Sequence, residues 1–315
     1  MRFGRYVFSC VFKDDAILPE YKGSTFRGLF GHALKKVVCA LKREDCRDCL
    51  LRSRCVYALV FETTPPSAAN AGKARIAAPP HPYVISPVAT PQTRYRQGES
   101  FDFTLLLFGQ ANDYLPYFVY AFAQIGQAGV GKSIKGKRAT FSLEKVIAGG
   151  EIAYSADCGK IVEGQFAHEL LLTDAPDEQR TADVLEINLL TPLRLKYDNH
   201  LEASLPFHIL VRAALRRISS LMAAYGAGEP ALDYRGLVAR ARDIRILSSS
   251  LRWFDWQRYS NRQDQAMLMG GMIGKVSYEG NLGEFLPLIR FCEKVHLGKQ
   301  TTFGLGKFSM HLPRA

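Results

Sequence analysis

The stretch His296–Met310, HLGKQTTFGLGKFSM, decides how the rest of the chain is interpreted. Its glycines and lysines are Gly298, Gly304, Gly306, Lys299 and Lys307. Glycines this dense let backbone N–H groups approach an anion closely, and lysines add positive charge beside them. The pattern therefore predicts a phosphate-binding loop, with a glycine-rich hairpin that only exposes its lysines as the alternative.

A second stretch, Gly126–Leu143, repeats the pattern as GQAGVGKSIKGKRATFSL. Each stretch follows an apolar segment of helical spacing, Tyr114–Ile125 in the first half and Phe285–Val295 in the second. Two similar endings about half a chain apart indicate two copies of one structural unit.

The composition indicates a globular protein with an anionic partner. A chain of 315 residues, 47% hydrophobic and 23% charged, is long enough for two domains with cores. The net charge of +11 favours nucleic acid first and an anionic membrane surface second. No apolar run is long enough to span a membrane, and the acidic pair Asp14 and Asp15 interrupts any signal-peptide pattern. We therefore expect a cytoplasmic protein without a membrane partner.

The coarse order of elements predicts an α+β fold. Helices are expected over about 24–41, 112–125, 206–225 and up to residue 295, and strands over 6–12, 82–87, 101–108, 139–146, 184–197, 270–278 and 308–310. The coarse order of each half, strand, helix, strands, helix, glycine-rich loop and strand, resembles βαββαβ, which is the ferredoxin-like unit. The acidic stretch 174–183 is the predicted linker. We therefore expect two tandem ferredoxin-like (RRM-like) domains, residues 1–176 and 182–315.

The first predicted helix carries a candidate catalytic group. Its polar face presents His32, Lys35 and Lys36, and Tyr21 lies just before the helix. A histidine can move a proton during phosphodiester cleavage while a lysine stabilises the developing negative charge. A solvated histidine without a chemical role is the alternative.

Four cysteines follow this helix closely. Cys39, Cys46, Cys49 and Cys55 are spaced C-x6-C-x2-C-x5-C, in which the central pair can grip one ion. Clustered cysteines in a cytosolic protein favour a metal site over disulfides. The spacing predicts a small insertion, residues 39–55, that holds structural zinc. An iron–sulfur cluster and four cysteines without a metal remain open.

Three further stretches have a possible role with nucleic acid or nucleotide. Gly126–Ser133 fits the P-loop pattern, but a helix is expected before it and a strand after it, which is the wrong context. Arg212 and Arg216 lie one turn apart on the helix 206–225, where a solvated face is the alternative. The stretch 253–262 mixes aromatic residues with arginines, which can stack bases or belong to the core.

Several segments together resemble a known family. They are FRGLFGHALKKVVC near the start, GQAGVGKSIKGKRATFSL in the middle, and RYSNRQDQAMLMGGMIGKVSYEGNL through HLGKQTTFGLGKFSM at the end. With them the chain resembles the CRISPR-associated endoribonucleases of the RAMP superfamily that process precursor CRISPR RNA. The resemblance implies two tandem ferredoxin-like domains, binding of a CRISPR repeat, and one cut by attack of a 2′-hydroxyl without a catalytic metal. Some RAMP proteins have comparable zinc-binding insertions.

In this sequence the family's catalytic region matches His32, Tyr21, Lys35 and Lys36. The predicted RNA-binding residues are Lys132, Lys135, Lys137, Arg138, Arg212, Arg216, Arg258, Arg262, His296, Lys299, Gly304, Gly306 and Lys307. The predicted partners are CRISPR repeat RNA, as precursor and as mature guide, and subunits of a CRISPR effector complex. A non-catalytic RNA-binding subunit of such a complex is the competing interpretation.

Overall fold

A computed structural model describes residues 1–42, 45–63, 79–88, 90–162, 164–172, 183–195, 203–260 and 265–313. The chain divides into two compact units. The first unit contains Met1–Leu170 with Ala224–Gly226, and the second unit contains Leu171–Ala223 with Ala227–Ala315. The predicted linker, 174–183, falls almost entirely outside the described residues.

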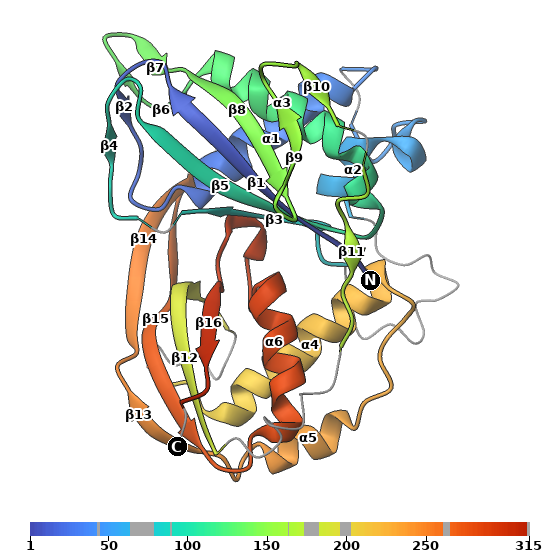
Figure 1. Ribbon diagram of the computed structural model, residues 1–315, viewed down its shortest axis with the longest axis vertical. Helices are drawn as coiled ribbons and strands as arrows, with labels where there is room; N and C mark the ends of the chain where they lie inside the picture. The colour runs from blue at the N-terminus through green and yellow to red at the C-terminus, as the bar shows by residue number, and fades with distance from the viewer. Residues whose placement is uncertain are drawn as a thin grey trace. The chain divides into compact units, whose positions relative to one another are not determined.

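The first unit is built on an antiparallel sheet in the order β10-β9-β8-β1-β5-β3 (Figure 1). Its strands are β1 (Arg2–Phe12), β3 (Tyr83–Pro87), β5 (Ser100–Phe108), β8 (Phe141–Ala148), β9 (Glu151–Ser155) and β10 (Lys160–Ile161), and β11 (His168–Glu169) also pairs with β1. Two small ribbons are β2 (Ala16–Ile17) with β4 (Arg94–Tyr95), and β6 (Val130–Ile134) with β7 (Lys137–Ala139). The helices are α1 (Gly23–Val38), α2 (Val56–Phe61) and α3 (Leu115–Ala128).

The central part of this sheet has ferredoxin-like connectivity. Along the chain, β1, α1, β3, β5, α3 and β8 follow one another as βαββαβ. Across the sheet, β8-β1-β5-β3 places the first strand between the last and the third, all antiparallel. The sequence pattern predicted this βαββαβ order, including the strand over 82–87 that the structure has as β3.

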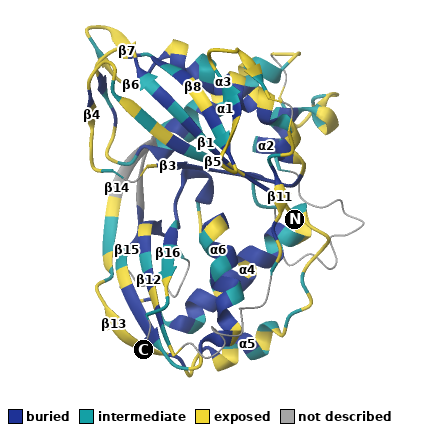
Figure 2. Cartoon of the chain, viewed as in Figure 1, coloured by how far each residue is buried: buried dark blue, intermediate teal, exposed yellow. Residues whose placement is uncertain are grey.

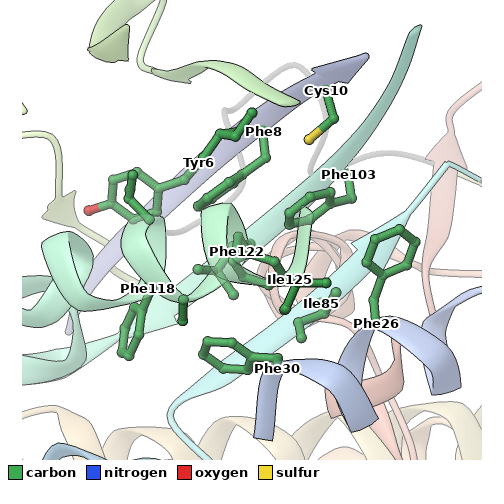
Figure 3. Close-up of a cluster of buried hydrophobic side chains, with 14 of the residues drawn as sticks. Tyr6, Phe8, Cys10, Phe26, Phe30, Ile85, Phe103, Phe118, Phe122 and Ile125 are labelled. Carbon is green, nitrogen blue, oxygen red and sulfur yellow. The ribbon is translucent and has the colours of Figure 1, made fainter. Parts of the chain in front are cut away.

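Alternating apolar residues explain how the core forms. Every second residue of β1, including Tyr6, Phe8 and Cys10, points to one face and is buried there. Helices α1 and α3 cover this face with apolar residues that recur every three or four positions along each helix. Phe30 of α1 and Phe122 of α3 are two of them (Figure 3). The rings of Phe30 and Phe122 lie parallel, with centroids 5.0 Å apart. The opposite face of α1 is therefore left toward solvent.

The second unit repeats the arrangement with the sheet order β13-β15-β12-β16, and β14 also pairs with β15. Its strands are β12 (Val184–Leu193), β13 (Arg245–Ser249), β14 (Arg252–Ser260), β15 (Gln265–Glu279) and β16 (Phe308–His311). Its helices are α4 (Phe207–Tyr225), α5 (Tyr234–Arg240) and α6 (Leu286–Val295). Helix α4 is mostly buried, whereas every residue of the edge strand β13 is exposed (Figure 2). Read from β16, the order again fits a ferredoxin-like unit.

Several elements differ from the sequence predictions. The helix expected from residue 112 begins as a 3-10 turn, Gly109–Tyr114, and α3 starts at Leu115 because Pro116 occupies its first turn. Helix α1 ends at Val38 because Cys39 is already extended. Residues 252–260, expected only as a possible base-stacking stretch, form the strand β14. In the described part of the chain, no helix has the length and apolar character of a membrane span.

Candidate functional site

The outer face of α1 presents the candidate catalytic histidine. His32 and Lys36 are both exposed and lie four residues apart, which places their Cβ atoms about 6 Å from each other. Gly28, one turn earlier on the same face, has open space where a side chain would stand. A substrate can therefore reach His32 and Lys36 together.

Lys35 is held differently from Lys36. Its Nζ lies over the ring of Tyr57, 5.5 Å from the centroid. Tyr57 stacks on Phe61 with centroids 5.1 Å apart, and the guanidinium of Arg27 lies 5.0 Å from the Phe61 centroid. Two cations of α1 thus enclose two rings of α2, an arrangement that stabilises the contact between these helices. Lys36, by contrast, remains exposed.

The segment that leads into α1 is anchored by a buried lysine. Lys22 is only 5% exposed, and its Nζ donates to the carbonyls of Glu20 (3.2 Å) and Thr90 (3.0 Å). Burial lowers the pKa of Lys22. Tyr21 beside it is half-buried, and burial raises the pKa of its phenol well above the ordinary value. Tyr21 is thus suited to hydrogen bonding as a neutral phenol. The buried anchor at Lys22 was not predicted, because it depends on the distant residue Thr90.

The glycine-rich segment of the second unit is folded onto itself. The N–H of Leu297 donates to Gly306 O (2.9 Å), and that of Gly304 donates to Thr301 O (2.8 Å). The N–H of Gly306 donates to Pro192 O (3.0 Å). The prediction that Gly304 and Gly306 offer their amides to phosphates is therefore not supported by this geometry. Both glycines have positive φ, and a Cβ on Gly306 would overlap the carbonyl of Leu297.

Two buried side chains fix this segment from other elements. The Oγ1 of Thr191, in β12, donates to Gly304 O and accepts from the N–H of Lys307, both at 2.8 Å. Arg217, in α4, donates through Nη2 to Val295 O (2.8 Å) and through Nε to His296 O (3.1 Å). Neither residue was predicted, because each is far from the segment in sequence.

The five residues of this segment that were predicted to bind RNA therefore differ in availability. His296 is buried, with Nδ1 3.1 Å from Leu305 O, and burial lowers its pKa to about 3. This burial does not support the predicted contact of the His296 ring with RNA. Lys299 is exposed, whereas Lys307 is half-buried. Lys299 is thus the most accessible cation of the segment.

The other glycine-rich stretch forms the β6–β7 hairpin of the first unit. Lys132, Lys135, Lys137 and Arg138 are all exposed on it (Figure 2). Its P-loop pattern has no P-loop structure, because α3 precedes it and a strand follows it. The hairpin is a basic protrusion and not a nucleotide cradle.

The remaining predicted RNA-binding arginines have mixed placements. Arg212 and Arg216 are exposed on α4. His208 lies one turn before Arg212, and burial, Arg242 and Arg212 lower its pKa. Arg258 belongs to β14, but its side chain, like Arg262, lies outside what the structure describes.

The four cysteines of the predicted insertion all lie among the described residues. Within the described ranges, no group of three or more histidine, cysteine, aspartate or glutamate side chains is arranged to hold a metal ion. Cys39, Cys46, Cys49 and Cys55 are all free thiols. Burial raises the pKa of Cys46, and the charges of Cys39 and Cys55 contribute to this increase. Zinc at these four cysteines therefore stays a prediction from their spacing.

The first unit also contains a cavity of about 550 Å³, lined by residues that include Arg2, Tyr6, Leu115 and Phe166. None of the predicted catalytic, RNA-binding or metal residues lines it. The candidate site is accordingly an exposed helix face, a shape that suits a polymer more than a small enclosed ligand.

Comparison with protein families gives two matches along the chain. The AF_1859_N family model, described as an N-terminal domain, matches residues 1–166. The model described as the CRISPR-associated endoribonuclease Cas6 matches residues 187–308. An uncharacterized protein of Archaeoglobus fulgidus is 25% identical over 295 residues, which cover 92% of each chain.

Solved structures share the fold at low sequence identity. A Cas6 product complex matches 99% of this chain and 100% of its own, with 14% identity and a TM-score of 0.52. Cas6 of Thermus thermophilus matches 98% of both chains, with 12% identity and a TM-score of 0.52. A partial Cas6-RT-Cas1–Cas2 complex matches 99% of this chain and 46% of its own, with 13% identity and a TM-score of 0.59.

The family matches account for both units, and the structural likeness confirms the fold. The first match alone covers more than half of the 315 residues. The chain belongs to the AF_1859_N family, and its residues 187–308 match the model of the CRISPR-associated endoribonuclease Cas6.

Proposed function

We propose that this protein is an endoribonuclease that cuts within the repeat of a precursor CRISPR RNA. The Cas6 family domain over residues 187–308 and the net charge of +11 support this function. The observation that supports the proposed catalytic site is the exposed pair His32 and Lys36, one helical turn apart on α1.

The proposed reaction needs only groups that this chain supplies. A ribose 2′-hydroxyl loses its proton to a general base as its oxygen attacks the adjacent phosphorus. The bond from phosphorus to the 5′-oxygen breaks, and that oxygen takes up a proton. The products are a 2′,3′-cyclic phosphate, or a 3′-phosphate after hydrolysis, and a 5′-hydroxyl. His32 acts as the general base or acid, and Lys36 stabilises the negative charge on the phosphate.

Lys35 and Tyr21 have smaller roles in this proposal. The ammonium of Lys35 already lies over the ring of Tyr57. Lys35 therefore attracts the phosphate at longer range and does not contact it directly. Tyr21, with its raised pKa, remains a neutral donor that positions a ribose or phosphate oxygen. The exposed cations of the β6–β7 hairpin and α4 supply the longer-range attraction for RNA.

The first test incubates the purified protein with the repeat RNA of its own genome in EDTA. We expect a single cut, seen on a denaturing gel, that a 2′-deoxy substitution at the cut position abolishes. Mass spectrometry of the fragments would identify the cyclic phosphate. Tight binding without a cut, with or without added metal, would instead identify a non-catalytic RNA-binding subunit.

The second test assigns His32. We expect His32→Ala to slow cleavage by roughly 10²- to 10⁴-fold with RNA affinity retained, the range typical of a general acid or base. Lys36→Ala should slow cleavage more than Lys35→Ala. His311→Ala is the matched control, because His311 is an exposed histidine on β16. Equal cleavage by His32→Ala and wild type would remove His32 from the mechanism.

We also propose structural zinc at Cys39, Cys46, Cys49 and Cys55, on the strength of their spacing. Elemental analysis of purified protein is expected to find one zinc per chain, and Cys46→Ser is expected to lose it. Cys158→Ser is the control, because Cys158 is exposed and lies outside the insertion. Iron with acid-labile sulfide would identify a cluster, and metal-free protein would refute the site.

A further inference from the structure

Two basic residues meet where β12 ends against the glycine-rich segment. Arg194 directly follows β12, and the N–H of Lys299 donates to the carbonyl of Arg194 at 2.8 Å. Their backbones are therefore side by side, although 105 positions separate them in the numbering. Sequence analysis singled out Lys299 but not Arg194.

The backbone around this pair is fixed on both sides. Gly298 has φ +88°, and a Cβ there would come within 2.6 Å of Arg194 O. The N–H of Gly306 donates to Pro192 O (3.0 Å), and Thr191 bonds to both Gly304 and Lys307. The end of β12 and the glycine-rich segment are joined at several points. The backbones of Arg194 and Lys299 therefore cannot move apart without unfolding the segment.

The two side chains of this pair differ in exposure. Lys299 is exposed and Arg194 is half-buried. Within the described residues, neither side chain forms an ion pair with a carboxylate. Two cationic side chains whose backbones are hydrogen-bonded can both be attracted to one anion. A guanidinium and an ammonium are the two side-chain groups that bind phosphate best.

The closed geometry of the segment decides which groups can bind. The amides of Leu297, Lys299 and Gly306 are already used in hydrogen bonds with other carbonyls. Phosphate recognition here must therefore come from side chains, and not from a backbone nest.

We propose that Arg194 and Lys299 together bind one phosphodiester of the RNA backbone at the end of β12. This inference rests on the proposed function as an RNA-binding endoribonuclease. In it, the glycines serve to fix the two cations next to each other, so that the pair binds as a preformed unit.

The test measures binding of a repeat RNA whose 2′-hydroxyls are methylated, so that it cannot be cut. Affinity is determined over a series of salt concentrations for wild type, Arg194→Ala, Lys299→Ala and the double variant. Arg235→Ala is the control, because Arg235 is an exposed arginine on α5 of the same unit. Circular dichroism confirms that each variant keeps the wild-type melting temperature.

For one shared phosphate, the double variant should lower the salt slope by about 0.7 to 0.9, the value for a single neutralised phosphate. Its loss of affinity should be smaller than the product of the two single losses. The control should match wild type, and Arg194→Lys should retain part of the affinity. Wild-type affinity in the double variant, or losses that multiply independently, would overturn the shared site while leaving the proposed function intact. Failure of the wild type to bind this RNA would overturn both.

Discussion

The two glycine-rich segments look alike in sequence and differ in structure. In 126–143 the glycines and lysines form the open β6–β7 hairpin, whose cations all project to solvent. In 296–310 Gly304 and Gly306 are buried, and hydrogen bonds tie the segment to itself and to β12. The same residue types thus place charge on a protrusion in one unit and fill a tightly packed turn in the other. A glycine–lysine pattern therefore predicts exposed charge more reliably than it predicts free amides.

The sharpest test of this difference replaces one glycine in each segment. Gly306→Ala is expected to destabilise the second unit by about 4 kcal/mol or more, because its φ is +71° and its Cβ would overlap Leu297 O. Gly136→Ala is expected to cost only about 1 to 2 kcal/mol, because its φ is +82° but nothing lies within 4 Å. Chemical denaturation of both variants measures the two changes in the free energy of unfolding. Equal losses would show that the two segments are packed alike.

A threonine in each region sharpens the comparison. Thr191→Val keeps the side-chain shape but leaves Gly304 O and the Lys307 N–H without their buried partner, which should cost about 2 kcal/mol. Thr140→Val removes an exposed bond from Oγ1 to Asp14, 2.6 Å long, and should cost about 0.5 kcal/mol. Thermal unfolding of both variants measures how much stability each substitution costs. A larger loss for Thr140→Val would reverse the assignment of the rigid segment.

Acidification should weaken the buried segment through His296. Burial lowers its pKa to about 3, below the ordinary value of about 6.5, so the unfolded state binds a proton that the folded state excludes. The contribution of neutral His296 to the free energy of unfolding is complete above about pH 6.5. It is lost as the pH falls toward 3, at about 1.4 kcal/mol per pH unit. His296→Asn, which tolerates the φ of +58°, should lose less stability between about pH 6.5 and 5. An unchanged pH slope would contradict this.

The smallest effect on folding is expected from the hairpin charges. Changing Lys132, Lys135, Lys137 and Arg138 together to glutamine should alter the free energy of unfolding by no more than about 0.5 kcal/mol. The salt slope of RNA binding should nevertheless fall by about 2 to 3, because these cations are exposed to backbone phosphates. A wild-type slope in this variant would mean that RNA does not contact the hairpin.

Much of the fold follows from periodic patterns in the sequence. Alternation predicts β1 and β5, and apolar residues three and four apart predict α1 and α4. The βαββαβ order then follows from the succession of elements. These features depend on neighbours in sequence, which is why they can be inferred without the structure.

The candidate site was predicted less completely, for a physical reason. His32 and Lys36 are exposed as a polar helix face requires, but the contact of Lys35 with Tyr57 depends on α2. The closure of the glycine-rich segment depends on Thr191 and Arg217, which no local pattern connects with it. Such tertiary contacts decide which of several similar side chains remain available.

The central position of β1 has a consequence for how the chain is made. Its buried residues, such as Phe8 and Cys10, pair on one side with β5 and on the other with β8, which ends at Ala148. At roughly 5 to 20 residues per second on the ribosome, β1 waits about 7 to 27 s for its second partner. During that time at least one edge of this apolar strand lacks its partner. Unpaired strand edges of this kind are prone to aggregation, so the first unit is most vulnerable before β8 has been made.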